Sequence, residues 1–127
     1  MERQWQQRIL IIDSDERALT VISDFLANEG FETITACGDE KALHLLRSGQ
    51  YDVILVDDRF ADLTSSCFLK ELARVPQNAP VIVMDSSPCR PCGIAPYDSF
   101  RANGLVSKWR PCEILEGVRQ ALSVPPI

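Results

Sequence analysis

The feature that most constrains this chain is a short apolar run that stops abruptly at two carboxylates. Residues 53–56 are all apolar and lead directly into Asp57 and Asp58. An uninterrupted, β-branched run of this length is typical of a parallel strand that is buried on both faces. Because open α/β sheets bind their ligands at the carboxyl ends of the strands, this pattern predicts that Asp57 lies at a binding edge.

Two further apolar runs end in the same way. Residues 8–12 lead into Asp13, and residues 80–84 lead into Asp85, whereas a shorter apolar pair is followed by Ser107 and Lys108. Carboxylates that converge at one edge repel each other at low dielectric unless a cation lies between them. Mg²⁺ prefers oxygen ligands and retains several waters, so the three acids predict a magnesium site at this edge.

Segments with helical spacing of apolar residues separate the strands. We expect helices over residues 15–28, 39–47 and 64–74, and a last helix that opens at Pro111, with Ser14 as the N-cap of the first. Residues 31–36 alternate as a short strand does, and the proline-rich segment 86–103 gives the weakest pattern. The order predicts an α/β fold: a five-stranded parallel sheet, flavodoxin-like, in a (βα)5 three-layer sandwich with strand order 2-1-3-4-5.

Length and charge limit the class of protein. The 127 residues suit one domain, which we expect at residues 8–122 between a polar lead-in (1–7) and a loose tail (123–127). A net charge of -5 argues against nucleic acid binding by this domain, since that affinity rests on basic residues. We see neither a membrane-spanning run nor a signal peptide, which favours a cytoplasmic protein.

The positions of these landmarks give the chain its resemblance to a known family. Over residues 8–122 the sequence resembles the receiver domain of bacterial two-component response regulators. The resemblance rests on Ile11-Ile12-Asp13, on Tyr51-Asp52-Val53-Ile54-Leu55-Val56-Asp57, on Pro80-Val81-Ile82-Val83 and on Lys108.

The resemblance implies a role for each matching residue. Asp57 corresponds to the phosphoacceptor, which takes a phosphoryl group from a histidine kinase or phosphotransfer protein. Lys108 corresponds to the lysine that pairs with the phosphoryl oxygens. Asp13 corresponds to one metal-binding acid, and together with Asp57 and the backbone carbonyl of Arg59 it would hold Mg²⁺. A carboxylate nucleophile attacks in line while the cations offset the charge that is transferred.

Four positions depart from the family pattern. Ser14 stands where a second metal-binding acid is usual, so we expect weaker Mg²⁺ binding. Asp85 replaces the Thr or Ser whose hydroxyl reports phosphorylation, and Leu105 replaces the usual Tyr or Phe of the switch. Trp109 follows Lys108 in place of proline, so a cis peptide bond is not expected there.

These departures leave two interpretations open. In one, Asp57 is phosphorylated and Asp85 serves as an additional metal ligand. In the other, Asp85 holds Lys108 in a standing ion pair, and the domain is a pseudo-receiver that binds partners without phosphorylation. In both, the domain is a signalling module rather than an enzyme, acts on a downstream protein through direct contact, and has the option of forming a homodimer.

The cysteines give a third hypothesis. Cys89 and Cys92 form a C-x-x-C motif after a predicted strand, a placement compatible with thiol–disulfide chemistry. Two cysteines are too few for a closed zinc site, and an odd total of five argues against a disulfide framework. We interpret Asp58 as a solvated neighbour of Asp57, and Trp109 as a packing residue or a surface contact.

Overall fold

The computed structural model describes residues 6–58, 79–85 and 104–123, and the fold is given for these residues. The helix expected at residues 64–74 and the segment 86–103 lie outside them. The elements are β1 (Arg8–Ile12), α1 (Glu16–Asn28), β2 (Glu32–Ala36), α2 (Asp39–Ser48), β3 (Val53–Asp57), β4 (Val81–Asp85), β5 (Gly104–Ser107) and α5 (Pro111–Ser123).

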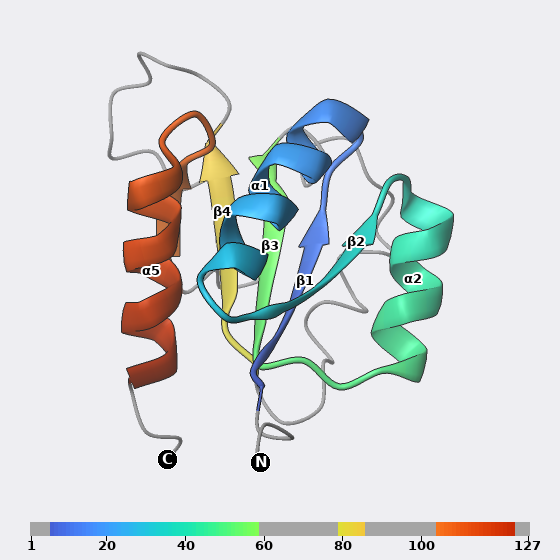
Figure 1. Ribbon diagram of the computed structural model, residues 1–127. Coiled ribbons are helices and arrows are strands. Elements are labelled where there is room, and N and C mark those ends of the chain that lie inside the picture. Colours follow the sequence, from blue (N-terminus) through green and yellow to red (C-terminus); the bar gives the residue numbers. More distant parts are fainter. Residues whose placement is uncertain (1–5, 59–78, 86–103, 124–127) are drawn as a thin grey trace.

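All five strands run parallel in one sheet with the order β2-β1-β3-β4-β5. This order confirms the predicted flavodoxin-like sheet. The register pairs Ile12 of β1 with Val56 of β3, and Asp57 of β3 with Met84 of β4. The carboxyl ends of these neighbouring strands therefore point toward the same edge of the sheet (Figure 1).

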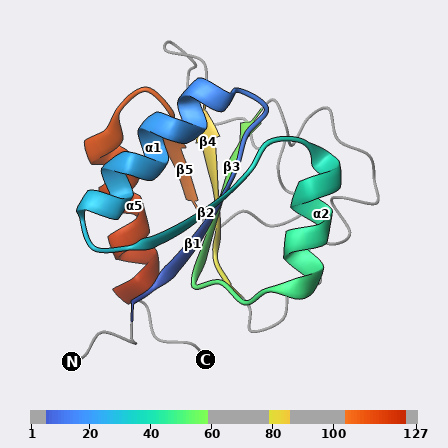
Figure 2. The same cartoon turned by 45° about the vertical axis from the view of Figure 1, so that its right-hand side comes forward.

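Side chains of the central strands alternate between two buried cores, one on each face of the sheet. Leu10 and Ile12 of β1 pack on the face that α2 covers, together with Ala42 and Leu46. Ile9 and Ile11 pack on the opposite face, which α1 and α5 cover. Figure 2 shows α2 on one side of the sheet, with α1 and α5 on the other. Burial on both faces explains why the strand sequences are continuously apolar.

The helix boundaries follow local chemistry, and the N-cap of α1 differs from the one predicted. The N-cap of α1 is Asp15 and not Ser14, because Oδ1 of Asp15 accepts the backbone N–H groups of Arg17 and Ala18. A carboxylate also complements the positive end of the helix dipole, which a hydroxyl cannot do to the same degree. As predicted, α1 ends before Gly30, whose φ of 100° is the left-handed conformation that glycine adopts without strain.

No helix in the described ranges is long and apolar enough to cross a membrane.

Candidate functional site

Strand order brings the predicted site residues to one edge of the sheet. Asp13 follows β1 and Asp57 ends β3, and these two strands are neighbours in the sheet. Lys108 follows β5, which is separated from β3 by β4. Neighbouring strands lie about 4.8 Å apart, so the long side chain of Lys108 has to cross β4 to reach the two acids.

The Lys108 ammonium makes that crossing and lies between the two carboxylates. Its Nζ is 3.0 Å from Oδ1 of Asp57, to which it donates a hydrogen bond, and 2.8 Å from Oδ2 of Asp13. Asp13 and Asp57 are inaccessible to solvent, and Lys108 is 3% exposed. Buried charges of this kind are stable only when paired, so the three side chains form one electrostatic unit.

Backbone hydrogen bonds fix the geometry of this unit. The backbone N–H of Asp15 donates to Oδ1 of Asp13 at 2.9 Å, which leaves Oδ2 facing Lys108. The backbone N–H of Lys108 donates to the carbonyl oxygen of Asp85 at 2.9 Å. These hydrogen bonds hold the loops that follow β1 and β5 in place, and so fix the positions of Asp13 and Lys108.

The site keeps Lys108 protonated. Burial acts to lower the pKa of Lys108, but the neighbouring carboxylates of Asp13 and Asp57 outweigh burial and raise the pKa above its ordinary value. The ammonium is therefore charged throughout the neutral range and offers a fixed positive charge beside Asp57.

Two features of the site were not foreseen from the sequence. Asp58 is 2% exposed, so its interpretation as a solvated neighbour is wrong. Asp58 directly follows β3, which is buried on both faces. Its position next to this apolar run was the sequence feature that indicated burial of Asp58. The second feature is Trp109, whose ring centroid lies 5.1 Å from Nζ of Lys108. Its adjacency to Lys108 was visible in the sequence, but the placement of the ring over the ammonium was not.

The other predicted residues that the structure describes lie at or beyond the margin of the site. Ser14 is exposed next to Asp13, and Asp85 is partly exposed at the end of β4. Leu105 lies within β5, opposite Val83 in the register. Arg59, Cys89 and Cys92 fall outside the residues that the structure describes.

The donor set at this edge fits a hard divalent cation. Oδ2 of Asp13 is buried and, apart from its ion pair with Lys108, has no hydrogen bond of ordinary geometry. The buried charged residues of the described chain are three carboxylates, Asp13, Asp57 and Asp58, and one ammonium, so negative charge is in excess. Mg²⁺ is commonly held by one or two carboxylates and completes its shell with water.

Within the described ranges no three His, Cys, Asp or Glu side chains come together as a metal cluster. Of the predicted metal ligands, Asp13 and Asp57 are the two that the structure brings together, on the same ammonium of Lys108.

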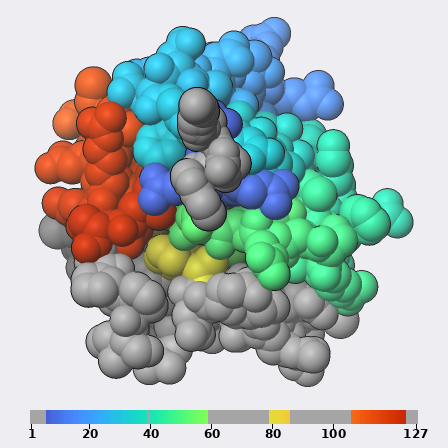
Figure 3. Space-filling model, turned by 60° about the horizontal axis from the view of Figure 1, so that its bottom comes forward, coloured from blue at the N-terminus to red at the C-terminus, as the bar shows by residue number. Residues whose placement is uncertain are grey.

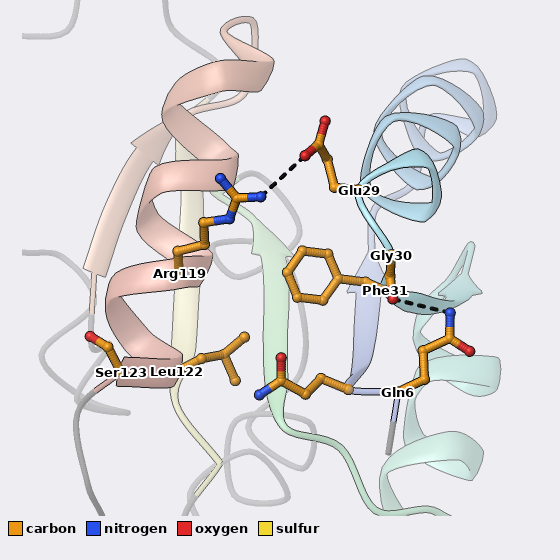
Figure 4. Close-up of a pocket in the computed structure, with 8 residues that line it drawn as sticks. Gln6, Glu29, Gly30, Phe31, Arg119, Leu122 and Ser123 are labelled. Carbon is orange, nitrogen blue, oxygen red and sulfur yellow. Dashed lines mark hydrogen bonds and ion pairs between the residues drawn. The ribbon is translucent and has the colours of Figure 1, made fainter. Parts of the chain in front are cut away.

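A pocket among the described residues lies at the opposite edge of the sheet. Its volume is about 430 Å³, and it is open to solvent between the start of β1, the α1–β2 connection and the end of α5. Figure 3 shows these segments meeting at that edge, and Figure 4 shows Arg119 and Glu29 paired across the pocket. Asp13, Asp57 and Lys108 do not line it, so the pocket is separate from the electrostatic unit that these side chains form.

A parallel sheet of this order, with two acids and one lysine at its carboxyl edge, is the flavodoxin-like fold of receiver-type signalling modules. The sequence model of the response regulator receiver domain matches residues 9–116, which is most of the chain. The chain belongs to this family, the receiver domains of two-component response regulators.

The chain is also similar in sequence to part of several longer regulatory proteins. Regulatory protein AtoC of Escherichia coli (strain K12) is 36% identical over 77 residues, which are 61% of this chain and 17% of AtoC. A putative transcriptional regulator of Haloferax volcanii is 30% identical over 122 residues, which are 95% of this chain and 20% of that protein. The chain spans between 17 and 34% of the length of the curated relatives it matches first.

Solved structures agree on the fold. TrrA of Thermotoga maritima, solved in complex with Mg(2+)-BeF, superposes with a TM-score of 0.76 at 24% identity, covering 92% of this chain and all of TrrA. A putative response regulator of Chloroflexus aurantiacus superposes with a TM-score of 0.78 at 20% identity, covering 94% of this chain and 99% of the other. At such identities the likeness establishes the fold alone.

Proposed function

We propose that Asp57 accepts a phosphoryl group from a phosphohistidine of a histidine kinase or phosphotransfer protein, and that the domain then signals through contact with a downstream protein. The observation that carries the proposal is the hydrogen bond of 3.0 Å from Nζ of Lys108 to Oδ1 of Asp57, with both side chains buried. This hydrogen bond supports the proposal, because the proposed nucleophile then lies beside a fixed positive charge.

The chemistry of the transfer follows from this pair. A carboxylate oxygen of Asp57 attacks phosphorus and forms an O–P bond, while the P–N bond to the donor imidazole breaks. The electron pair of that bond goes to the imidazole nitrogen, which takes a proton from solvent. The Lys108 ammonium offsets negative charge on the phosphoryl oxygens as they approach, and such electrostatic stabilisation is the main catalytic term in phosphoryl transfer.

A bound Mg²⁺ ion would also offset the negative charge on the phosphoryl oxygens. Asp13 and Asp57 would hold the ion, and it would supply further positive charge to the phosphoryl oxygens when bound. With Ser14 beside Asp13 in place of a second acid, the protein contributes fewer charged ligands, so we expect the affinity for Mg²⁺ to be lower than with two adjacent acids.

The test is phosphorylation by a small donor, measured by intact mass. The protein is incubated with acetyl phosphate and MgCl₂, in which attack by Asp57 breaks a P–O bond and releases acetate. We expect a gain of one phosphoryl group in the parent protein and no gain in Asp57→Asn. Asp58→Asn is the matched control, because it neutralises the adjacent buried carboxylate and should still be phosphorylated.

The outcomes separate the proposal from the pseudo-receiver hypothesis. If the parent gains no phosphoryl group at saturating donor and Mg²⁺, the proposed acceptor role of Asp57 is wrong. If Asp57→Asn gains as much as the parent, the acceptor is another residue. The redox hypothesis for Cys89 and Cys92 stays a prediction, since both cysteines lie outside the described residues.

The partners that we propose for the domain are those expected of a receiver domain. Receiver domains interact with histidine kinases and with downstream effectors, and the matched relatives are named as regulatory proteins much longer than this chain. A homodimer remains a proposal that sedimentation of the phosphorylated and unphosphorylated protein would test.

A further inference from the structure

The Lys108 ammonium has a third neighbour besides the two acids. Trp109 follows Lys108 directly, and the centroid of its ring lies 5.1 Å from Nζ. The face of an aromatic ring attracts a cation within about 6 Å, and tryptophan does so most strongly. Three groups, two carboxylates and one indole, therefore share a single positive charge.

Trp109 differs from the other members of this cluster in its exposure. Asp13, Asp57 and Lys108 are each buried, whereas Trp109 is 53% exposed. The ring is thus the part of the cluster that a second molecule can touch. Val21, the other large apolar side chain with high exposure among the described residues, lies on α1 and is not part of the cluster.

A change of charge at Asp57 must redistribute the interactions of the ammonium. Phosphorylation adds negative charge and new acceptor oxygens at Asp57, which attract the ammonium more strongly than the carboxylate does. Asparagine at the same position has the opposite effect, since it removes the charge. In both cases we expect the attraction between the ammonium and the ring to change, although Trp109 lies 52 residues further along the chain than Asp57.

We propose that Trp109 is a positioning residue for the Lys108 ammonium, and that its half-exposed ring reports the charge state of Asp57 at the protein surface. The part of this inference that concerns phosphorylation rests on the proposed function. The part that concerns the coupling between Asp57, Lys108 and Trp109 does not, because it follows from the contacts of the unmodified protein.

The first experiment measures the coupling without phosphorylation. The chain has two tryptophans, so Trp5→Phe leaves the indole N–H of Trp109 as a single resonance in a ¹H–¹⁵N spectrum. We expect this resonance to move when Asp57→Asn is added. Asp52→Asn is the matched control, because Asp52 lies just before β3 at the far end, where its carboxylate accepts the backbone N–H of Arg8. It removes the same charge and should leave the resonance in place.

The second experiment measures positioning through the rate of phosphorylation by acetyl phosphate. Trp109→Leu keeps apolar bulk but removes the ring face, so we expect the maximal rate to fall by about two- to fivefold, with the half-saturating donor concentration unchanged. Trp109→Phe retains a ring face and should recover most of the rate. Thermal unfolding of the two variants, for which we expect equal melting temperatures, separates this loss of positioning from a packing defect.

The results distinguish failure of this inference from failure of the proposed function. A Trp109 resonance that is identical in the parent and in Asp57→Asn overturns the coupling, whether or not the protein is phosphorylated. Rates that are equal in the parent and in Trp109→Leu overturn the positioning role while leaving Asp57 as the acceptor. If no variant is phosphorylated but the resonance moves in Asp57→Asn alone, the proposed function fails and the coupling stands.

Discussion

Lys108 reaches across β4 to place its ammonium 3.0 Å from a carboxylate oxygen of Asp57, and neither side chain is open to solvent. Asp13 lies on the other side of the same ammonium, at 2.8 Å. One cation is therefore shared by two buried anions from different strands. We therefore expect the stability of this edge of the sheet to depend on that cation more than on either acid.

Replacing Lys108 tests this dependence. Lys108→Met keeps the length of the side chain but leaves Asp13 and Asp57 buried without their cation, so we expect a loss of about 3–5 kcal/mol in the free energy of unfolding. Asp57→Asn should cost less, because the ammonium retains Asp13. Urea denaturation at neutral pH measures both changes.

An exposed ion pair provides the control for this measurement. Arg119 and Glu29 lie 3.1 Å apart, but the Arg119 side chain is 59% exposed. Solvent screens such a pair, so Arg119→Met should change stability by no more than about 1 kcal/mol. If Lys108→Met were as mild as Arg119→Met, the buried unit would contribute little to the fold.

Much of this arrangement could be predicted from the sequence, for a physical reason. The apolar runs before Asp13, Asp57 and Asp85 identify strands buried on both faces, and parallel strands place their carboxyl ends at one edge. The spacing of apolar residues does not decide which of two adjacent polar residues caps a helix. Ser14 and Asp15 both suit an N-cap, and the choice depends on backbone angles that only the folded chain sets. The burial of Asp58 depends likewise on tertiary packing.

The cap of α1 offers a matched pair of variants. Asp15→Ala removes the oxygen that accepts the N–H groups of Arg17 and Ala18, so we expect a loss of about 1 kcal/mol in the free energy of unfolding. Ser14→Ala removes a hydroxyl from an exposed position and should leave stability nearly unchanged. Equal losses in the two variants would contradict Asp15 as the cap.

Tyr51 provides a prediction about alkaline pH. Burial raises the pKa of Tyr51 above its ordinary value of 10.0, and the nearby positive charge of Arg8 only partly opposes this. The phenol also donates a hydrogen bond of 2.8 Å to the carbonyl oxygen of Leu45. The folded state thus holds the neutral phenol, while the unfolded chain ionises near pH 10.0.

This difference in pKa decides how the stability of the protein changes with pH. The contribution of Tyr51 to stability is complete below pH 10.0 and is lost as pH rises from that value through the raised pKa of the folded state. In Tyr97→Phe, which leaves Tyr51 as the single tyrosine, the phenolate absorbance should appear at a pH above 10.0. Tyr51→Phe should reduce the alkaline loss of stability measured by urea denaturation.

Close packing between α5 and β5 gives a test at Gly117. A methyl group at Gly117 would lie 2.8 Å from Cγ1 of Val106, closer than side chains normally approach. Alanine gains about 1 kcal/mol in helix propensity, but overpacking costs about 1–3 kcal/mol, so we expect Gly117→Ala to destabilise the protein slightly. In a double-mutant cycle with Val106→Ala, the two substitutions should together cost less than their sum.

Substitution of Ser14 gives a prediction about the affinity of the site for Mg²⁺. Ser14→Asp places a second carboxylate next to Asp13, at an exposed position where the added charge costs little desolvation. Because charged oxygen ligands tune the affinity of a site for a divalent cation, we expect the dissociation constant for Mg²⁺ to fall on the order of tenfold. Isothermal titration of the unphosphorylated protein with MgCl₂ measures this directly.

Two controls make the Mg²⁺ result specific to the site. Ser14→Asn adds a neutral oxygen of similar size and should improve affinity much less, since it adds no charge. Asp13→Asn in the Ser14→Asp background should abolish the gain, because it removes the buried carboxylate that faces Lys108. A gain that survives Asp13→Asn would place the bound ion elsewhere and contradict the assignment of Asp13 as a metal ligand.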